Sequence, residues 1–169
     1  MTFPDDGFWN SRTSLREIKD YAVSRLVSPD AVLAVTLCRI IAATPPHVVL
    51  PPTIGSDYGS LNFGVVILGN PGPGKDAAFG AAKALVPDIR DAPVTSVASG
   101  QAISALFGQR VQEDGRFRLE CKSPRAMLRY SEASNFRALS SARENNLQPE
   151  VLSLSLIHIS EPTRRSYIS

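Results

Sequence analysis

The chain has few of the residues that build disulfide frameworks or zinc sites. It contains only two cysteines, Cys38 and Cys121, and two histidines, His47 and His158, among 169 residues. The cysteines lie far apart in the sequence, and the four side chains match no familiar zinc-ligand spacing. The sequence therefore predicts neither a disulfide scaffold nor a zinc site, and the cysteines indicate reduced thiols in a cytoplasmic protein.

The sequence also lacks a membrane-spanning run, a signal peptide and a strong net charge. Its most apolar stretch, Ala31–Ala43, is shorter than the roughly 20 residues that a bilayer-spanning helix needs. The first ten residues are acidic and have no apolar core, unlike a signal peptide. A net charge of +2 indicates neither a nucleic-acid surface nor a membrane surface. The composition, 43% hydrophobic and 20% charged, is that of one soluble domain without a membrane partner.

A glycine-rich loop ending in lysine follows an apolar run within residues 64–76. Gly69 and Gly74-Lys75 have the G-x-x-x-x-G-K spacing of a phosphate-binding P-loop, although Asp76 replaces the usual serine or threonine. Glycines let backbone N–H groups surround a phosphate, lysine supplies a positive charge, and the next helix points its positive end at the anion. We therefore predict binding of a nucleoside triphosphate, ATP, with Mg²⁺. The predicted nucleotide-binding residues are Gly69, Asn70, Pro71, Gly72, Pro73, Gly74, Lys75, Asp76 and Ala77.

The segments on either side of the loop support this interpretation. Val65–Leu68 is a short, wholly apolar run typical of a strand buried on both faces. Asp76–Val86 predicts an alanine-rich helix, starting at about Lys75, that Pro87 ends. The alternative is a glycine-rich turn that binds nothing. Asp76 keeps that alternative open, because its carboxylate either holds Mg²⁺ or adds negative charge beside the phosphates.

Two helices are expected before the loop. The first begins at Asn10 or Ser11 and runs to about Val27, with an apolar stripe formed by Leu15, Ile18, Ala22 and Leu26. Ser28 caps the second helix, and Pro29 lies in its first turn.

The second helix is apolar on nearly every face except at Thr36 and Arg39, so it should be buried between other elements. Thr44-Pro45-Pro46 ends it. His47–Leu50 then predicts a short edge strand or an extended arm.

Further elements are expected after the loop helix. Val94–Val97 predicts a second short strand, residues 99–107 a helix, and Ala126–Tyr130 a third strand. Arg110–Glu120 predicts a hairpin that turns at residues 113–116. The cations around this hairpin are Arg110, Arg116, Arg118 and Lys122. They are interpreted as a solvated edge whose charge opposes aggregation, with contact to nucleic acid or phosphates as the alternative.

The pair Ser131-Glu132 follows the third predicted strand. A P-loop enzyme needs an acidic residue at the end of such a strand, to hold magnesium and to polarise the attacking water. Glu132 is the best-placed candidate, although the magnesium-binding aspartate usual at the position of Ser131 is missing. An exposed glutamate that caps a following helix is the alternative.

Three segments together resemble a known family: Ala42–Pro52, Ser60-Leu61-Asn62 and the P-loop. They are similar to P-loop ATPases of actinobacterial plasmids, phages and integrated elements, which often accompany primase–polymerase modules. In that family a Ser-Glu or Pro-Glu pair commonly follows the third strand, and the residue after the P-loop lysine varies. The resemblance covers roughly residues 20–150.

The resemblance implies an α/β fold, namely a partial P-loop NTPase (RecA-like) parallel sheet preceded by an N-terminal helical segment at residues 1–59. It gives residues 60–154 as the NTPase core. Glu132 would be the catalytic base and, with Asp76, a metal ligand, while Lys75 would act on the phosphates. The implied activity of the full-length parent is a DNA-dependent ATPase or helicase in mobile-element replication, with DNA as partner and a possible homo-oligomeric ring.

The end of the chain differs from the rest. Ser155–Arg164 resembles a translated sequencing-adapter read-through, so residues 155–169 are expected to be a non-native tail. The core would then stop before the further strands, polar sensor residue and arginine finger of the class. On this interpretation the chain has marginal stability, exposes apolar surface and does not hydrolyse ATP even where it binds nucleotide.

Two other functions remain open. The loop sequence is similar to the G-x-P-G-x-G-K loop of nucleoside monophosphate kinases, although those enzymes usually begin with the P-loop strand and need lid arginines. The other function is non-enzymatic, a nucleotide-binding remnant. Phosphoryl transfer to a panel of monophosphates would distinguish the kinase from a DNA-stimulated ATPase.

Overall fold

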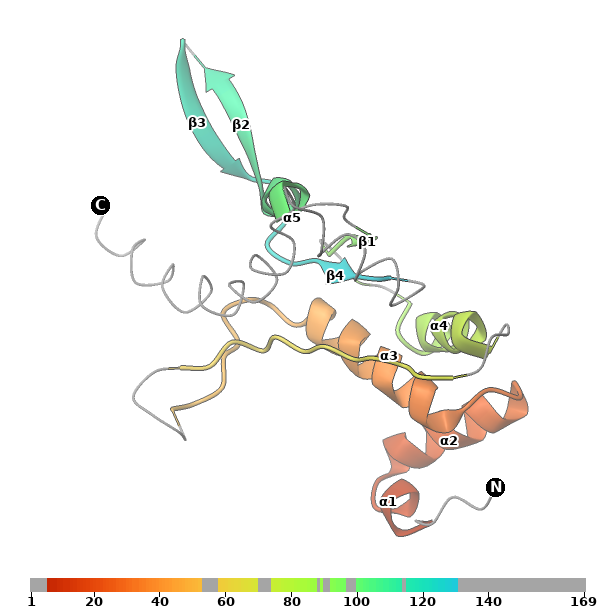
Figure 1. Cartoon of the computed structure of the whole chain (residues 1–169). Coiled ribbons are helices and arrows are strands. Elements are labelled where there is room, and N and C mark those ends of the chain that lie inside the picture. The colour runs from red at the N-terminus through yellow and green to blue at the C-terminus, as the bar shows by residue number, and fades with distance from the viewer. Residues whose placement is uncertain are drawn as a thin grey trace. The chain divides into compact units, whose positions relative to one another are not determined.

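The computed structural model describes residues 6–52, 58–69, 74–87, 89, 92–96, 100–113 and 115–130. Over these residues the chain is a mixed α/β protein (Figure 1). Its elements are, in chain order, α1 (Asp6–Asn10), α2 (Thr13–Ser24), α3 (Pro29–Ala43), α4 (Gly74–Leu85), β1 (Val94–Thr95), α5 (Gly100–Phe107), β2 (Gly108–Glu113), β3 (Arg116–Cys121) and β4 (Met127–Leu128). The chain divides into two compact units, Met1–Ala43 with Phe63–Ile89, and Thr44–Asn62 with Arg90–Ser169.

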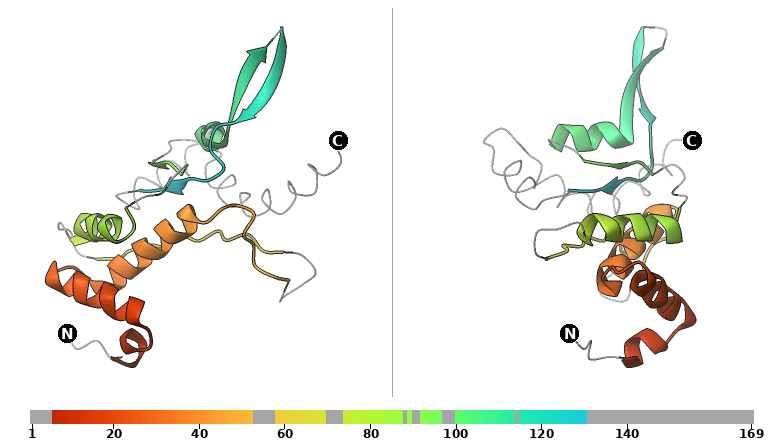
Figure 2. Two further views of the ribbon diagram at one scale, coloured as in Figure 1. Left: turned by 180° about the vertical axis from the view of Figure 1, so that it is seen from behind. Right: turned by 90° about the vertical axis from the view of Figure 1, so that its right-hand side faces the viewer.

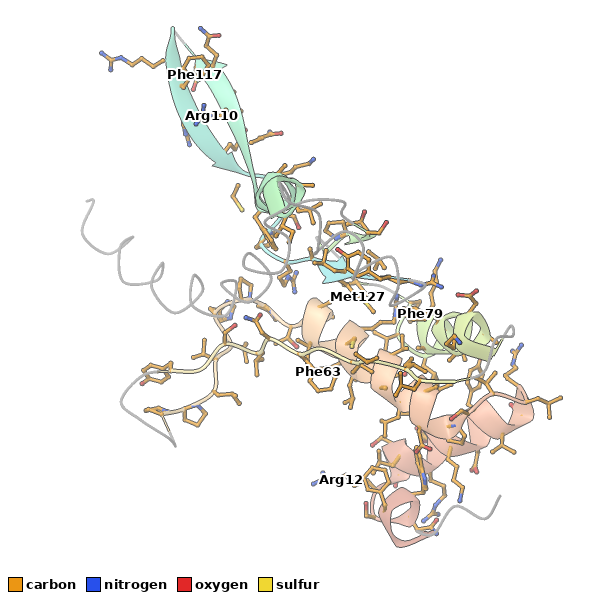
Figure 3. All side chains as sticks on the ribbon, viewed as in Figure 1. Arg12, Phe63, Phe79, Arg110, Phe117 and Met127 are labelled. Carbon is orange, nitrogen blue, oxygen red and sulfur yellow. The ribbon has the colours of Figure 1, made fainter. Side chains whose placement is uncertain are left out.

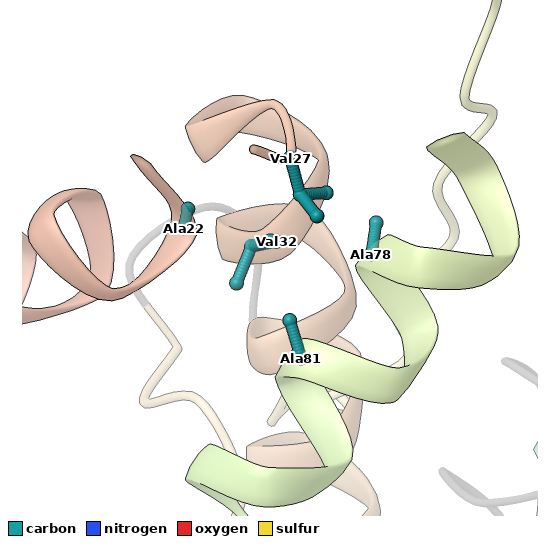
Figure 4. Packing of buried hydrophobic residues seen from close by; sticks show 5 residues of the cluster. All are labelled: Ala22, Val27, Val32, Ala78 and Ala81. Atoms are coloured by element: carbon teal, nitrogen blue, oxygen red, sulfur yellow. The ribbon is translucent and has the colours of Figure 1, made fainter. Parts of the chain in front are cut away.

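The first unit is a helical assembly in which α3 packs against both α2 and α4. Its core consists of small and β-branched side chains, and Figure 4 shows how closely they approach. The buried members are Ala22, Val27, Val32, Ala78 and Ala81, with Ile18, Tyr21, Ala31 and Leu85 packed around them. Alanines on α4 let the helix backbones approach closely, and this explains why an alanine-rich helix is buried here. The prediction of the loop helix is confirmed, with bounds Gly74–Leu85.

α2 ends in a hydrogen-bonded turn that was not predicted. Leu26 adopts a φ of +57°, its N–H bonds to the Val23 carbonyl at 3.0 Å, and the Val27 N–H bonds to the Ala22 carbonyl at 3.0 Å. This is the Schellman arrangement, which closes a helix with a left-handed residue and places the next apolar residue against the last turn. Leu26 is therefore 96% exposed, and its predicted place in the apolar stripe was wrong.

The start of α2 also differs from the prediction. Arg12, with extended backbone, precedes the first helical residue, Thr13. Asn10 instead ends α1, and the Ser11 hydroxyl donates to the Phe8 carbonyl at 2.6 Å. The serine closes α1 rather than opening α2, because its side chain bonds back into the preceding turn.

α3 begins as predicted. The Ala31 N–H bonds to the Ser28 hydroxyl at 3.4 Å, and Pro29 is the first helical residue. The burial around α3 does not follow polarity, however. Two of its polar residues, Thr36 and Arg39, are 2% and 6% exposed.

Two apolar side chains of α3, Leu37 and Ile40, are 39% and 46% exposed. The expectation that the helix is buried between other elements is confirmed for α2 and α4, but Leu37 and Ile40 show that its burial is incomplete.

The predicted strand Val65–Leu68 is not formed. Residues 61–69 have no strand hydrogen bonding in the structure, and Val66 and Leu68 are 76% and 87% exposed. Within the first unit, residues 63–69 run as an extended chain along α3 (Figures 1 and 2). A strand buried on both faces requires neighbouring strands, and no described strand pairs with this one.

The second unit contains two small sheets, drawn in green to cyan in Figures 1 and 2. β1 and β4 pair in parallel, with Val94 opposite Met127 and Thr95 opposite Leu128. These are the predicted second and third strands, each confirmed but shorter than expected. Val97 lies outside the described residues.

α5 and the hairpin follow the predictions closely. α5 buries Ile103, which is 1% exposed, among Ala102, Leu106, Phe107, Leu128 and Tyr130. β2 and β3 form an antiparallel pair from Gly108–Cys121 to Glu113–Arg116, and Gly115 supplies the positive φ, +73°, that the tight turn requires.

The predicted arm at His47–Leu50 forms one antiparallel bridge, from Leu50 to Gly59, and otherwise no strand. No described helix is long and apolar enough to cross a membrane.

Candidate functional site

The candidate site lies at the N-terminal end of α4. This helix begins at Gly74, and Lys75 is its second residue. The Lys75 ammonium donates a hydrogen bond to the Gly69 carbonyl oxygen at 3.1 Å. The first and last residues of the predicted P-loop are thus joined, so the lysine charge is held beside the start of the helix.

The electrostatics of this end favour an anion. A helix carries about half a positive charge at its N-terminus, where its first N–H groups have no partner within the helix. The Lys75 ammonium adds a full positive charge at the same place, and Asp76 in the first turn opposes it. Lys75 is half-buried and Asp76 is exposed, so the carboxylate is accessible to water or to a cation.

The glycines at both ends of the loop have open space around them. A Cβ atom added at Gly69 or Gly74 would meet no heavy atom within 4 Å. Packing against the described residues therefore does not explain these glycines. Open space beside the backbone permits close approach of an anion such as a phosphate, although Gly64 and Gly80 have the same open space.

The far end of α4 is held by Arg39, whose buried guanidinium contacts the residues that follow the helix. Its Nε donates to the Val86 carbonyl at 2.8 Å and its Nη2 to the Pro87 carbonyl at 3.2 Å. Burial lowers the pKa of this guanidinium, because desolvation disfavours the charged form. A cation at a helix C-terminus compensates the negative end of the helix dipole, so α3 fixes the helix that carries the site.

Of the predicted nucleotide-binding residues, the structure describes Gly69, Gly74, Lys75, Asp76 and Ala77, and brings the first and third into contact. The remaining four, residues 70–73, lie outside the described residues. Ala77 is exposed on the first turn of α4.

The prediction of a metal pair, Asp76 with Glu132, stays a prediction, because Glu132 also lies outside the described residues. Among the side chains that the structure does describe, no group of three or more His, Cys, Asp or Glu could hold a metal ion.

Arg39 is only partly predictable from the sequence. Its charge interrupts a mostly apolar helix, which marks it as an exception. Its partners are carbonyl oxygens 47 and 48 residues away, and no sequence pattern identifies them.

The arrangement places backbone N–H groups, a lysine ammonium and an accessible carboxylate at one helix end. Groups of this kind can bind phosphates and ligate a divalent cation. Comparison of the chain with protein-family models, curated proteins and solved structures finds no match.

Proposed function

We propose that residues 69–77 bind the phosphates of a nucleoside triphosphate, ATP, with Mg²⁺. The observation that carries the proposal is the 3.1 Å contact between the Lys75 ammonium and the Gly69 carbonyl at the start of α4. In the G-x-x-x-x-G-K pattern, lysine reaches the β- and γ-phosphates while loop N–H groups hold the others. The lysine exchanges its carbonyl partner for phosphate oxygens when nucleotide binds.

The proposal extends to a functional class, a P-loop NTPase fold with DNA-dependent ATPase or helicase activity. Support comes from the parallel pairing of β1 with β4, because Ser131-Glu132 follows β4 in the sequence. In parallel sheets, catalytic groups gather beyond the carboxyl ends of the strands. Glu132 would orient and deprotonate the attacking water, and bound Mg²⁺ would neutralise charge on the phosphate oxygens.

Nucleotide binding is tested by thermal unfolding of the full chain with and without ATP and Mg²⁺. Binding to the folded state alone stabilises it by about 2.7 kcal/mol at a ligand concentration of 100 times Kd. We expect Lys75→Ala to remove this stabilisation, because it deletes the charge that holds the phosphates. Lys83→Ala is the matched control, since Lys83 is an exposed lysine in the last turn of the same helix.

Two results would contradict the proposal. Stabilisation by ATP that is unchanged in Lys75→Ala would show that the nucleotide binds elsewhere. If ATP at millimolar concentration does not stabilise the unmodified chain, the chain does not bind ATP as proposed. Steady ATP turnover at a rate ordinary for the class would instead contradict the expectation that this chain binds without hydrolysing.

The role of Asp76 is tested by Asp76→Asn in the same assay. If the carboxylate holds Mg²⁺, the variant loses the part of ATP affinity that depends on Mg²⁺. If it only repels phosphates, the variant binds ATP more tightly both with and without the metal, because one like charge beside the anion is gone.

A further inference from the structure

The β2–β3 hairpin has two faces of different chemistry. Opposite residues of an antiparallel pair point to the same side, and successive pairs alternate. One face therefore carries Gln109 with Glu120, Val111 with Arg118, and Glu113 with Arg116. The other face, the Phe117 face, carries Gly108 with Cys121, Gln112 with Phe117, and Arg110.

The carboxylates lie only on the first of these faces. There Glu113 lies opposite Arg116, and the Glu120 carboxylate accepts a hydrogen bond from the Gln109 amide at 3.3 Å. The Phe117 face has no acidic residue. Its charged side chain is Arg110, which is exposed and lies one position diagonally from Phe117.

Phe117 is the most exposed of the described aromatic side chains, at 74%. Figure 3 shows it towards the turn end of the hairpin, with Arg110 further along the strands. β2 and β3 pair only with each other among the described strands, and the 74% exposure of Phe117 shows that the described residues leave this ring largely uncovered. A solvated edge that opposes aggregation needs its cations but gains nothing from an exposed phenyl ring.

We propose that the Phe117 face binds single-stranded nucleic acid, with a base stacked on Phe117 and a phosphate held by Arg110. Proteins that bind single-stranded nucleic acid without sequence preference combine aromatic rings, on which bases stack, with neighbouring cations that contact phosphates. The Gln112 amide, directly opposite Phe117, can donate to a base edge or a phosphate. The absence of carboxylates on this face favours an anionic partner, and the aromatic ring favours exposed bases over a duplex backbone.

The proposal deepens the proposed function by naming the surface that meets nucleic acid. It is tested without nucleotide, so either proposal can fail while the other holds. The probe is a fluorescein-labelled oligo-dT of 20 nucleotides, titrated with the full chain and followed by fluorescence anisotropy. A 20-base-pair duplex with the same label is the comparison.

We expect Phe117→Ala to weaken oligo-dT binding at least about fivefold, the lower end of the measured effect of removing one stacked base. Tyr58→Ala is the matched control, because Tyr58 is 61% exposed and belongs to the same unit but not to the hairpin. Arg110→Gln should reduce the magnitude of the salt slope by about 0.7, which corresponds to one phosphate contact on a single strand. Arg16→Gln, an exposed arginine on α2, should leave the slope unchanged.

A second measurement needs no variant of the hairpin. Cys121 lies on the Phe117 face and is exposed, whereas Cys38 lies in α3 and is half-buried. Oligo-dT should protect Cys121 from alkylation and leave the rate at Cys38 unchanged. Duplex binding as tight as oligo-dT binding, unchanged affinity in Phe117→Ala, or alkylation of Cys121 at the same rate with and without oligo-dT would each overturn the proposal.

Discussion

Removing the guanidinium of Arg39 tests whether its hydrogen bonds or the desolvation of its charge has the larger effect on the stability of the fold at the end of α4. The side chain is 6% exposed and bonds two carbonyl oxygens, at 2.8 Å and 3.2 Å. Hydrogen bonds from a charged group stabilise a fold by about 1.5–3 kcal/mol each. Desolvation of the charge destabilises the fold, and it also lowers the pKa of Arg39.

The geometry indicates that the hydrogen bonds dominate. The shorter bond lies near the ideal N–H···O distance, and the longer one is at the upper limit of the normal range. We expect Arg39→Met, which keeps the aliphatic stem, to lower the free energy of unfolding by about 2 kcal/mol. Arg39→Ala also removes the packing of the stem and should cost about 3 kcal/mol. Arg39→Lys keeps the charge but loses the fork geometry, so it should cost about 1 kcal/mol.

The measurement is urea unfolding of each variant, followed by helical circular dichroism. Arg16→Met is the control, because Arg16 is exposed on α2 and should change stability by less than about 0.5 kcal/mol. An Arg39→Met variant as stable as the unmodified chain would refute the reasoning, since it would show that desolvation cancels the two hydrogen bonds.

Three further predictions concern single side chains. Leu26→Gly should stabilise the fold by about 0.5–1 kcal/mol in the same urea assay, because the leucine has a φ of +57° and is 96% exposed. Glu17→Gly, within α2, should instead destabilise the fold by roughly that amount, and a loss of stability in both variants would refute the prediction. Thr36→Val should raise the free energy of unfolding by about 1 kcal/mol, because the buried Thr36 hydroxyl has no hydrogen-bond partner among the described residues, and a loss would indicate that the hydroxyl is bonded. Iodoacetamide should alkylate Cys38 more slowly than Cys121 at pH 8, because burial raises the pKa of the Cys38 thiol and leaves less thiolate; equal rates by mass spectrometry would contradict this.

The boundaries of α3 and α4 were predictable because their signals are local. Ser28 and Pro29 mark the start of α3, and Pro87 follows α4, within one or two residues of the observed ends. The left-handed residue after α2 was not predictable, since glycine is the usual signal there and the sequence has leucine. The cost of Leu26 in that conformation is offset by the two hydrogen bonds of the turn and by burial of Val27.

The strands were less predictable because their hydrogen bonds join distant residues. The apolar run Val65–Leu68 signals burial but does not specify a partner strand, and the described residues provide none. β1 and β4 form because each pairs with the other, more than 30 residues along the chain. The hairpin was the easiest case, since Gly115 fixes its turn and the two strands adjoin it.

The two ends of α4 connect the stability of the helix to the proposed site. At the C-terminal end, the negative pole of the helix is balanced by the buried charge of Arg39. At the N-terminal end, the positive pole and the Lys75 ammonium have the same sign, with Asp76 as the carboxylate of the first turn. A bound phosphate would supply the remaining negative charge and so stabilise the helix that binds it. Changes at Arg39 should therefore weaken nucleotide binding only as far as they unfold α4, whereas changes at Lys75 should weaken it in a fully folded chain.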